Sequence, residues 1–258
     1  MNLRYLSGAI ISIPLIPLMY YQAKKIRDSV PRLPEAKGKS GLSLTEDKSA
    51  KQISLLFIGE STIAGVGVQT HEQGFAGTFA QELSKLKDIN ISWKVYARSG
   101  NTVKKVNQKL LAKITDEQAD LLVIGLGAND AFTLNSPSKW NKEIRRLIKS
   151  LQQKYPSATI LFCNMPPIKE FPAFTSLIKF TIGNLVEILG EEVKGIVDEF
   201  ENVFYCEEKL SLNEWIQKSE LKLDPQDFFS DGIHPSKLTY QIWAKEVAKE
   251  YVNLTNDV

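Results

Sequence analysis

The sequence is poor in cysteine and histidine, the residues on which several kinds of functional site depend. Its 258 residues include two cysteines, Cys163 and Cys206, and two histidines, His71 and His234. The cysteines lie far apart and form no Cys-x-x-Cys pair, so neither a zinc site nor a disulfide framework is indicated. Two buried thiols are the simpler interpretation. Any mechanism that needs an imidazole therefore has two candidate residues.

An excess of charge of either sign is also missing. Lysine and arginine total 32, against 30 for aspartate and glutamate, which leaves a formal net charge of +2. Such a balance creates no field that would draw the chain to a polyanion, and we expect no nucleic-acid partner. Hydrophobic residues make up 43% and charged residues 24%, values typical of a globular protein with a sizeable core.

The longest run without a charge lies near the N-terminus, in residues 5–23, between Arg4 and Lys24. A helix needs about 20 apolar residues to cross a bilayer, so the run predicts a membrane anchor or an interfacial segment within residues 1–30. Pro14 and Pro17 weaken the prediction of a straight helix. A segment that docks on the protein's own surface is the alternative.

The residues after this run suggest how the chain is divided. If the run spans a membrane, Lys24, Lys25 and Arg27 favour a cytoplasmic location for the rest of the chain, with an exported or periplasmic location as the alternative. Residues 31–51 are rich in proline, glycine, serine and charge, without apolar periodicity, and are predicted to form a linker. Residues 52–258 have the size of one domain, which we expect to be catalytic.

That domain alternates between strand and helix patterns. Short apolar or β-branched runs predict strands, and longer amphipathic stretches between them predict helices. The predicted strands are 53–58, 91–97, 121–124, 159–163 and 203–206, and the predicted helices are 74–87, 102–113, 137–154, 176–200 and 236–252. The alternation predicts an α/β fold, a three-layer α/β/α sandwich around a mostly parallel five-stranded sheet.

Polar residues follow several of these strands, at the edge where α/β sheets bind ligands. Ser61 follows the first strand near the expected start of a helix, whose dipole would stabilise a developing negative charge. A helix cap is the plain alternative for Ser61. Neither phosphate-loop pattern is complete, because Gly65-Val66-Gly67 is followed by neither Lys-Ser/Thr nor a third glycine. Gly100 and Asn129 follow two further strands and offer N–H donors.

A histidine stands near the C-terminus with a carboxylate three residues before it, in Asp231-Gly232-Ile233-His234. A carboxylate so placed can accept a hydrogen bond from Nδ1 and leave Nε2 free as a base. A zinc site is disfavoured, because the chain has one other histidine and no His-Glu-x-x-His. A serine, N–H donors and an Asp–His pair are the parts of acyl transfer, which requires neither a metal nor an organic cofactor.

In chain order these segments resemble the four sequence blocks of the SGNH hydrolases, also called the GDSL esterase/lipase family. The resemblance extends from about residue 53 to residue 251 and implies that family's flavodoxin-like fold. It implies that Ser61 is the nucleophile, with His234 as its base and Asp231 as the partner of His234. It also implies an oxyanion hole built from Ser61, Gly100 and Asn129.

The function implied by the resemblance is hydrolysis of a carboxylic ester through an acyl-enzyme. Thioesterases and O-acetyl esterases use the same constellation and stay open as alternatives. A catalytically attenuated, membrane-tethered binding protein is a further alternative. One position favours it, because Glu60 stands where the family usually has aspartate, so the contacts of that carboxylate are open.

The stretch after the fourth strand, residues 165–182, is the candidate acyl pocket. Its apolar residues Phe171, Phe174, Leu177 and Ile178 are predicted to line that pocket, and ordinary core packing is the alternative. An apolar pocket in a chain that begins with an apolar run favours a lipid or other acyl ester over a polysaccharide acetyl group. We therefore expect a small-molecule or lipid ester as substrate and membrane association through residues 5–23.

Overall fold

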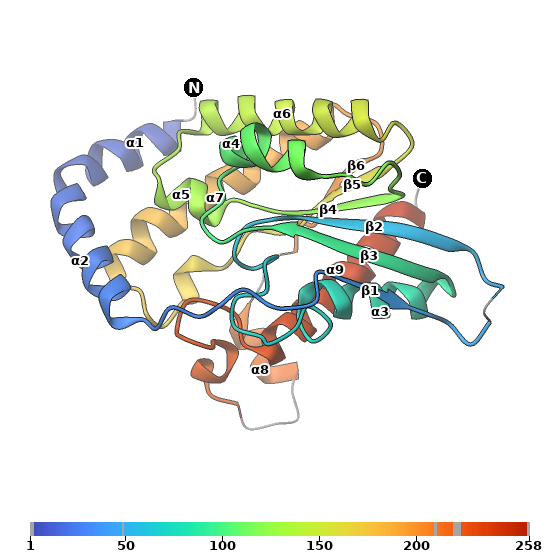
Figure 1. The fold of residues 1–258 in the computed structure, drawn as a ribbon. Helices are drawn as coiled ribbons and strands as arrows, with labels where there is room; N and C mark the ends of the chain where they lie inside the picture. Colours follow the sequence, from blue (N-terminus) through green and yellow to red (C-terminus); the bar gives the residue numbers. More distant parts are fainter. Residues whose placement is uncertain (1–2, 48, 209–210, 219–222, 257–258) are drawn as a thin grey trace.

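The computed structural model describes residues 3–47, 49–208, 211–218 and 223–256. A central sheet carries helices on both sides (Figure 1). The strands are β1 (Ser40–Ser43), β2 (Gln52–Gly59), β3 (Asn90–Ala97), β4 (Leu121–Gly125), β5 (Thr159–Phe162) and β6 (Val203–Tyr205). The α-helices are α1 (Leu3–Ser12), α2 (Ile16–Ser29), α3 (Phe75–Lys87), α4 (Val103–Lys105), α5 (Ala128–Phe132), α6 (Pro137–Lys154), α7 (Ser176–Val197), α8 (Leu212–Lys218) and α9 (Lys237–Asn256).

The strands lie in the order β1-β3-β2-β4-β5-β6. β1 runs antiparallel to β3, and the other four pairs are parallel. The predicted α/β/α fold with a mostly parallel sheet is confirmed, with six strands in place of the predicted five. All five predicted strands are present, and the carboxyl ends of β2 and β4 lie side by side at Gly59 and Gly125.

The additional strand, β1, lies within the segment that we predicted to be a linker. It is a four-residue edge strand in which Gly41 pairs with Trp93. A Cβ atom on Gly41 would lie 2.3 Å from the Trp93 ring, so the strand fits there because glycine has no side chain. Its neighbour Leu42 is exposed and Ser43 is buried, which is the reverse of an apolar strand pattern. This is why the sequence does not predict β1.

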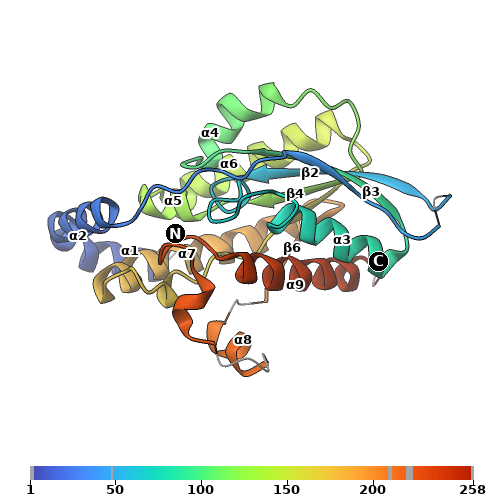
Figure 2. The same cartoon turned by 60° about the horizontal axis from the view of Figure 1, so that its bottom comes forward.

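Two apolar cores lie on the two faces of the sheet. Leu56 and Ile58 of β2 point to the face covered by α4, α6 and α7, whereas Leu55 and Phe57 point to the face covered by α3 and α9. Figure 2 shows α3 and α9 side by side under the sheet. Because successive residues of a strand alternate between faces, a continuous apolar run such as β2 is buried on both.

Residues 3–29 are helical almost throughout and lie along α7 at one end of the molecule (Figures 1 and 2). The 3₁₀ turn Ile13–Leu15, which contains Pro14, joins α1 to α2. By length and composition this stretch could cross a membrane. Arg4 forms ion pairs with Glu187 and Glu191 of α7, so the stretch also docks on the domain.

The segment between α2 and β2 contacts the loop that follows β2. Ala36 is buried, and its N–H donates to Ala64 O at 3.0 Å. The N–H of Lys37 donates to Gln69 O at 3.0 Å, and Lys37 O accepts the N–H of His71 at 2.9 Å. The division at residues 30 and 51 stays a prediction, but residues 36–37 are hydrogen-bonded to the domain.

Candidate active site

Ser61 stands at the carboxyl end of β2, in a series of turns. The predicted helix that follows Ser61, residues 74–87, is α3, which begins at Phe75, so Ser61 itself stands in turns and not at a helix N-terminus. Gly65 and Gly67 lie between, with φ angles of 70° and 106°, and this left-handed backbone interrupts a right-handed helix.

Asp231 and His234 are in direct contact, as the sequence predicted. His234 Nδ1 lies 2.8 Å from Asp231 Oδ2, and Asp231 Oδ1 accepts the backbone N–H groups of Ile233 and His234 at 2.9 and 2.7 Å. The Asp231 side chain has 0% exposure and His234 has 23%. Burial alone would raise the pKa of Asp231, but the hydrogen bonds from His234 outweigh it, and the pKa is lowered. The carboxylate is thus held ionised beside the imidazole.

The loop that carries His234 packs against the loop that follows Ser61. Ser230 Oγ donates to Gly67 O at 3.0 Å, and Tyr240 of α9 donates to Val66 O at 2.8 Å. A Cβ atom on Gly67 would lie 2.4 Å from Pro235 O, so the close approach requires glycine at this position. These contacts join two loops that are about 170 residues apart and bring His234 to the side of the sheet where Ser61 lies.

A cavity of about 560 Å³ brings most of the predicted site residues together. Six of the predicted residues line it: Ser61, Asn129, Phe171, Phe174, Ile178 and His234. Gly100, Leu177 and Asp231 are not among its lining residues, although Ser99, next to Gly100, and His234, in contact with Asp231, are. Within the described chain, no hydrogen bond joins the side chains of Ser61 and His234, which face the same space.

Asn129 lines this cavity and carries an amide donor on its side chain. Its Nδ2 atom is buried and has no hydrogen-bond partner among the described residues. A buried donor without a partner is rare, because leaving one unpaired costs about 1–3 kcal/mol. An acceptor atom of a bound ligand would satisfy it.

Glu60 holds the backbone that carries Asn129. Its two carboxylate oxygens accept the N–H groups of Ala128 and Asn129 at 2.9 and 3.0 Å. Burial raises the pKa of Glu60 to about 8, although these two hydrogen bonds oppose the shift. Because Glu60 immediately precedes Ser61, one carboxylate links the serine turn to the Asn129 loop. The sequence did not predict this contact, since the two segments are 68 residues apart.

Asp130 supports the same loop from its other side. It is fully buried, and its carboxylate accepts Val103 N–H at 2.9 Å and Asn135 Nδ2 at 3.0 Å. Burial raises its pKa to about 6. Asp130 therefore connects α5 to the start of α4 and does not line the cavity.

The titration of Glu60 predicts a pH-dependent stability. Its carboxyl has an ordinary pKa of 4.5 when unfolded and about 8 when folded, so at intermediate pH the folded state binds more protons. The free energy of unfolding is therefore expected to fall as pH rises from about 6.5 to 8, by at most about 1.4 kcal/mol per pH unit. Folded His71 and Asp130 titrate below this window, with pKa values of about 4 and 6. Unfolded His71, with an ordinary pKa of 6.5, adds a smaller slope of opposite sign at the lower end of the window, and Glu60→Gln retains that slope.

Urea unfolding of the wild type and of Glu60→Gln at several pH values in this window tests the prediction. The glutamine variant is expected to lose the slope, and the matched surface variant Glu117→Gln is expected to keep it. Equal slopes in the wild type and in Glu60→Gln would contradict the assignment.

The sequence also missed one side of the cavity. Ala23, Ile26, Val30 and Leu33, from the end of α2 and the residues after it, line the same space as Ser61. Ile26 belongs to α2, but Val30 and Leu33 follow the end of that helix at Ser29, so no helical periodicity marked the three as one apolar face.

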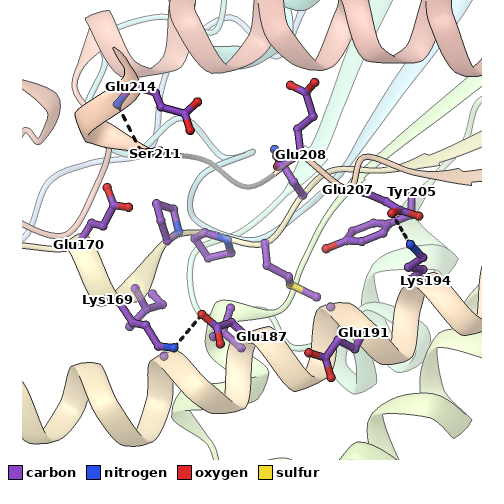
Figure 3. A pocket seen from close by; sticks show the side chains of 18 residues that line it. Lys169, Glu170, Glu187, Glu191, Lys194, Tyr205, Glu207, Glu208, Ser211 and Glu214 are labelled. Carbon is purple, nitrogen blue, oxygen red and sulfur yellow. Dashed lines mark hydrogen bonds and ion pairs between the residues drawn. The ribbon is translucent and has the colours of Figure 1, made fainter. Parts of the chain in front are cut away.

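A second cavity, of about 500 Å³, lies on the other side of residues 164–168 (Figure 3). Its walls carry several glutamates, and two of these pair with lysines, Glu187 with Lys169 and Glu207 with Lys194. Glu170 accepts the backbone N–H of Leu212 at 2.7 Å. These carboxylates already have partners within the fold. In the part of the chain that the structure describes, no group of three or more acidic, histidine or cysteine residues is placed to hold a metal.

One family profile matches this sequence, and many solved structures have a similar fold. The sequence profile of the GDSL-like lipase/acylhydrolase family matches residues 57–242, well over half of the chain. No curated protein matches. The crystal structure of TesA is 18% identical, covers 76% of this chain and 96% of its own, and has a TM-score of 0.54.

Two further solved structures have the same architecture. A catalytic mutant of Axe2, an acetylxylan esterase from Geobacillus stearothermophilus, is 18% identical, with a TM-score of 0.58 and coverage of 79% of this chain and 95% of that one. A member of the lipolytic protein G-D-S-L family from Veillonella parvula is 14% identical, with a TM-score of 0.57 and coverage of 80% and 99%. At these identities the likeness establishes the fold.

Proposed function

Because the chain belongs to the GDSL-like lipase/acylhydrolase family, we propose that it hydrolyses a carboxylic ester with Ser61 as nucleophile, His234 as base and Asp231 as the partner of His234. The observation that carries the proposal is the 2.8 Å contact between Asp231 and His234 at the cavity that Ser61 also lines. Buried, ionised Asp231 fixes the tautomer in which Nδ1 bears the proton and Nε2 is free to accept one.

The first half of the reaction forms an acyl-enzyme. His234 Nε2 takes the proton of the Ser61 hydroxyl as Oγ bonds to the ester carbonyl carbon, and the carbonyl oxygen becomes an oxyanion. When the tetrahedral intermediate collapses, the bond to the alcohol oxygen breaks and His234 gives its proton to that oxygen. Asp231 stabilises the imidazolium that exists between these two transfers.

The second half releases the acid. A water molecule gives a proton to His234 Nε2 as its oxygen attacks the acyl carbon, and the collapse of this second intermediate returns the proton to Ser61 Oγ. The acyl group leaves as a carboxylic acid and the enzyme is restored. No cofactor enters either half.

The oxyanion of both intermediates is assigned to Ser61 N–H, Gly100 N–H and the Asn129 side chain. The unpartnered Nδ2 of Asn129 supports its part in this assignment. Gly100 lies in an exposed turn next to Ser99, which lines the cavity.

Replacing Asn129 by alanine is expected to lower kcat by about 10²–10³-fold, with a much smaller change in KM. The reason is that the amide donor contacts an oxyanion that exists only in the intermediates. Ester turnover by the full chain measures the effect, and Asn253→Ala, an exposed asparagine on α9, is the matched control. A loss in kcat of less than threefold would contradict the assignment of Asn129 to the oxyanion hole.

The substrate is proposed to be an acyl ester of the lipid type. Three of the predicted apolar residues, Phe171, Phe174 and Ile178, line the cavity and support this choice. The N-terminal stretch leaves large apolar side chains exposed, among them Ile10 at 70%, Ile13 at 61% and Tyr20 at 69%. Exposed apolar side chains along one helical segment are suited to a lipid surface, so we propose membrane association through residues 5–23.

A panel of p-nitrophenyl esters of increasing chain length, together with an acyl thioester, tests the proposed function with the full chain in one detergent. Highest kcat/KM on medium or long chains supports the lipid-type substrate. Turnover of acetyl esters alone favours the O-acetyl esterase alternative, and turnover of the thioester alone favours a thioesterase. No turnover by a folded protein that also fails to react with a fluorophosphonate contradicts the proposal and favours the binding-protein alternative.

A further inference from the structure

The end of α2 and the residues after it cross one side of the cavity between fixed points. At one end, Thr175 Oγ1, which caps α7 beside Phe174, donates to Gln22 Oε1 at 2.6 Å. At the other end, Glu35 Oε1 accepts Ser99 N–H at 2.8 Å. Buried Ala36 donates to Ala64 O in the loop after Ser61. Residues 22–36 are therefore attached to three segments that surround the cavity.

Between these points the segment turns apolar side chains into the cavity. Ala23, Ile26, Val30 and Leu33, here called the N-terminal wall, are lining residues. Ile26 packs against the same apolar cluster as Phe171, Phe174 and Ile178. Phe171 and Phe174 stack with their ring centroids 5.6 Å apart. The cavity thus has a polar end, at Ser61 and His234, and an apolar part to which two distant regions of the chain contribute.

Resting on the proposed ester hydrolysis, we propose that the N-terminal wall binds the acyl chain of the substrate and sets the chain length that the enzyme accepts. The same helix, α2, carries the exposed side chains Tyr20 and Tyr21. One segment therefore joins the surface that meets lipid to the cavity that holds Ser61. An acyl chain that moves along α2 from a lipid surface to Ser61 would contact apolar side chains on the way. It would therefore not be exposed to water.

This role differs from that of a simple anchor. An anchor raises the local concentration of substrate and leaves the selectivity among soluble esters unchanged. A wall changes the ratio of kcat/KM between long and short acyl chains, because only the long chain reaches it. The ratio is the informative quantity.

The test uses two substitutions in the wall and two at a control position. Ala23→Trp fills the cavity, and Ile26→Ala removes apolar contact from it. Leu86→Trp and Leu86→Ala make comparable changes at an exposed residue of α3 that does not line the cavity. For each full-length variant, kcat/KM is measured for p-nitrophenyl decanoate and p-nitrophenyl acetate, and the affinity for a dansyl-labelled fatty acid is measured by fluorescence.

Ala23→Trp is expected to lower the decanoate-to-acetate ratio by about tenfold or more and Ile26→Ala by about threefold to tenfold, and both should weaken binding of the fatty acid. The Leu86 variants should keep the wild-type ratio and affinity. Wild-type ratios and affinities in both wall variants, with unchanged melting temperatures, would overturn the inference while ester turnover upheld the proposed function. Weakened fatty-acid binding in a chain that hydrolyses no ester would uphold the wall and reject the proposed function.

Discussion

Replacing Ser61 by alanine is expected to lower kcat by at least about 10⁴-fold on every ester that the wild type hydrolyses. The substitution removes the oxygen that forms the acyl-enzyme, so both halves of the reaction are lost together. The turnover that remains above the rate in water would come from the oxyanion donors and from substrate binding. Chromogenic ester hydrolysis by the full-length variant measures the loss.

A control variant and a covalent probe test whether the loss in Ser61→Ala comes from the missing nucleophile. Ser157→Ala, at an exposed serine in a turn, should retain wild-type turnover, and both variants should unfold at the wild-type temperature. A fluorophosphonate should add its mass to the wild type and to Ser157→Ala but not to Ser61→Ala. A folded Ser61→Ala protein that keeps more than a tenth of wild-type turnover would show that another group is the nucleophile.

Replacing Asp231 by asparagine is expected to lower kcat by about 10⁴-fold while the protein stays folded. An amide at this position keeps the shape of the side chain but carries no charge, and its NH₂ group would favour the tautomer in which Nε2 holds the proton. In that tautomer His234 has no free nitrogen facing Ser61. The loss of charge also removes the stabilisation of the imidazolium that forms during each proton transfer.

The pH profile separates this role from a structural one. In Asp231→Asn the pH dependence of the residual turnover should differ from that of the wild type, since the imidazole no longer acts as the base. Asp88→Asn, an exposed aspartate in a left-handed position that suits asparagine, is the matched control and should behave as the wild type. A loss of less than tenfold in Asp231→Asn would assign the 2.8 Å contact to loop structure alone.

Glu60 bears on whether the site is active or attenuated. Its departure from the family's usual aspartate was the one sequence feature that favoured an inactive protein. The Glu60 carboxylate nevertheless makes hydrogen bonds to the backbone of both Ala128 and Asn129. The longer side chain thus has a structural use, because it holds the backbone of the loop that carries Asn129.

Local patterns in the sequence were enough to predict most of the architecture. The apolar runs of β2 and β4 predict strands buried on both faces, and their alternation with amphipathic helices leaves few arrangements other than a parallel sheet between two helix layers. The Asp231–His234 contact was also predictable, because three residues in a glycine-containing loop span it. Such features depend on residues that are close together in the chain, and their spacing can be read directly from the sequence.

Only the tertiary structure decided which distant segments meet. The Glu60 contact with the Asn129 loop, the pairing of β1 with β3, and the apolar wall at Ile26 each join residues more than 30 positions apart. It also decided that Leu177 lies off the cavity while Ile178, one residue on, lines it. Such contacts depend on how whole helices and loops pack against the sheet. A single polar or weakly apolar residue carries no local sign of the partner that packing will give it.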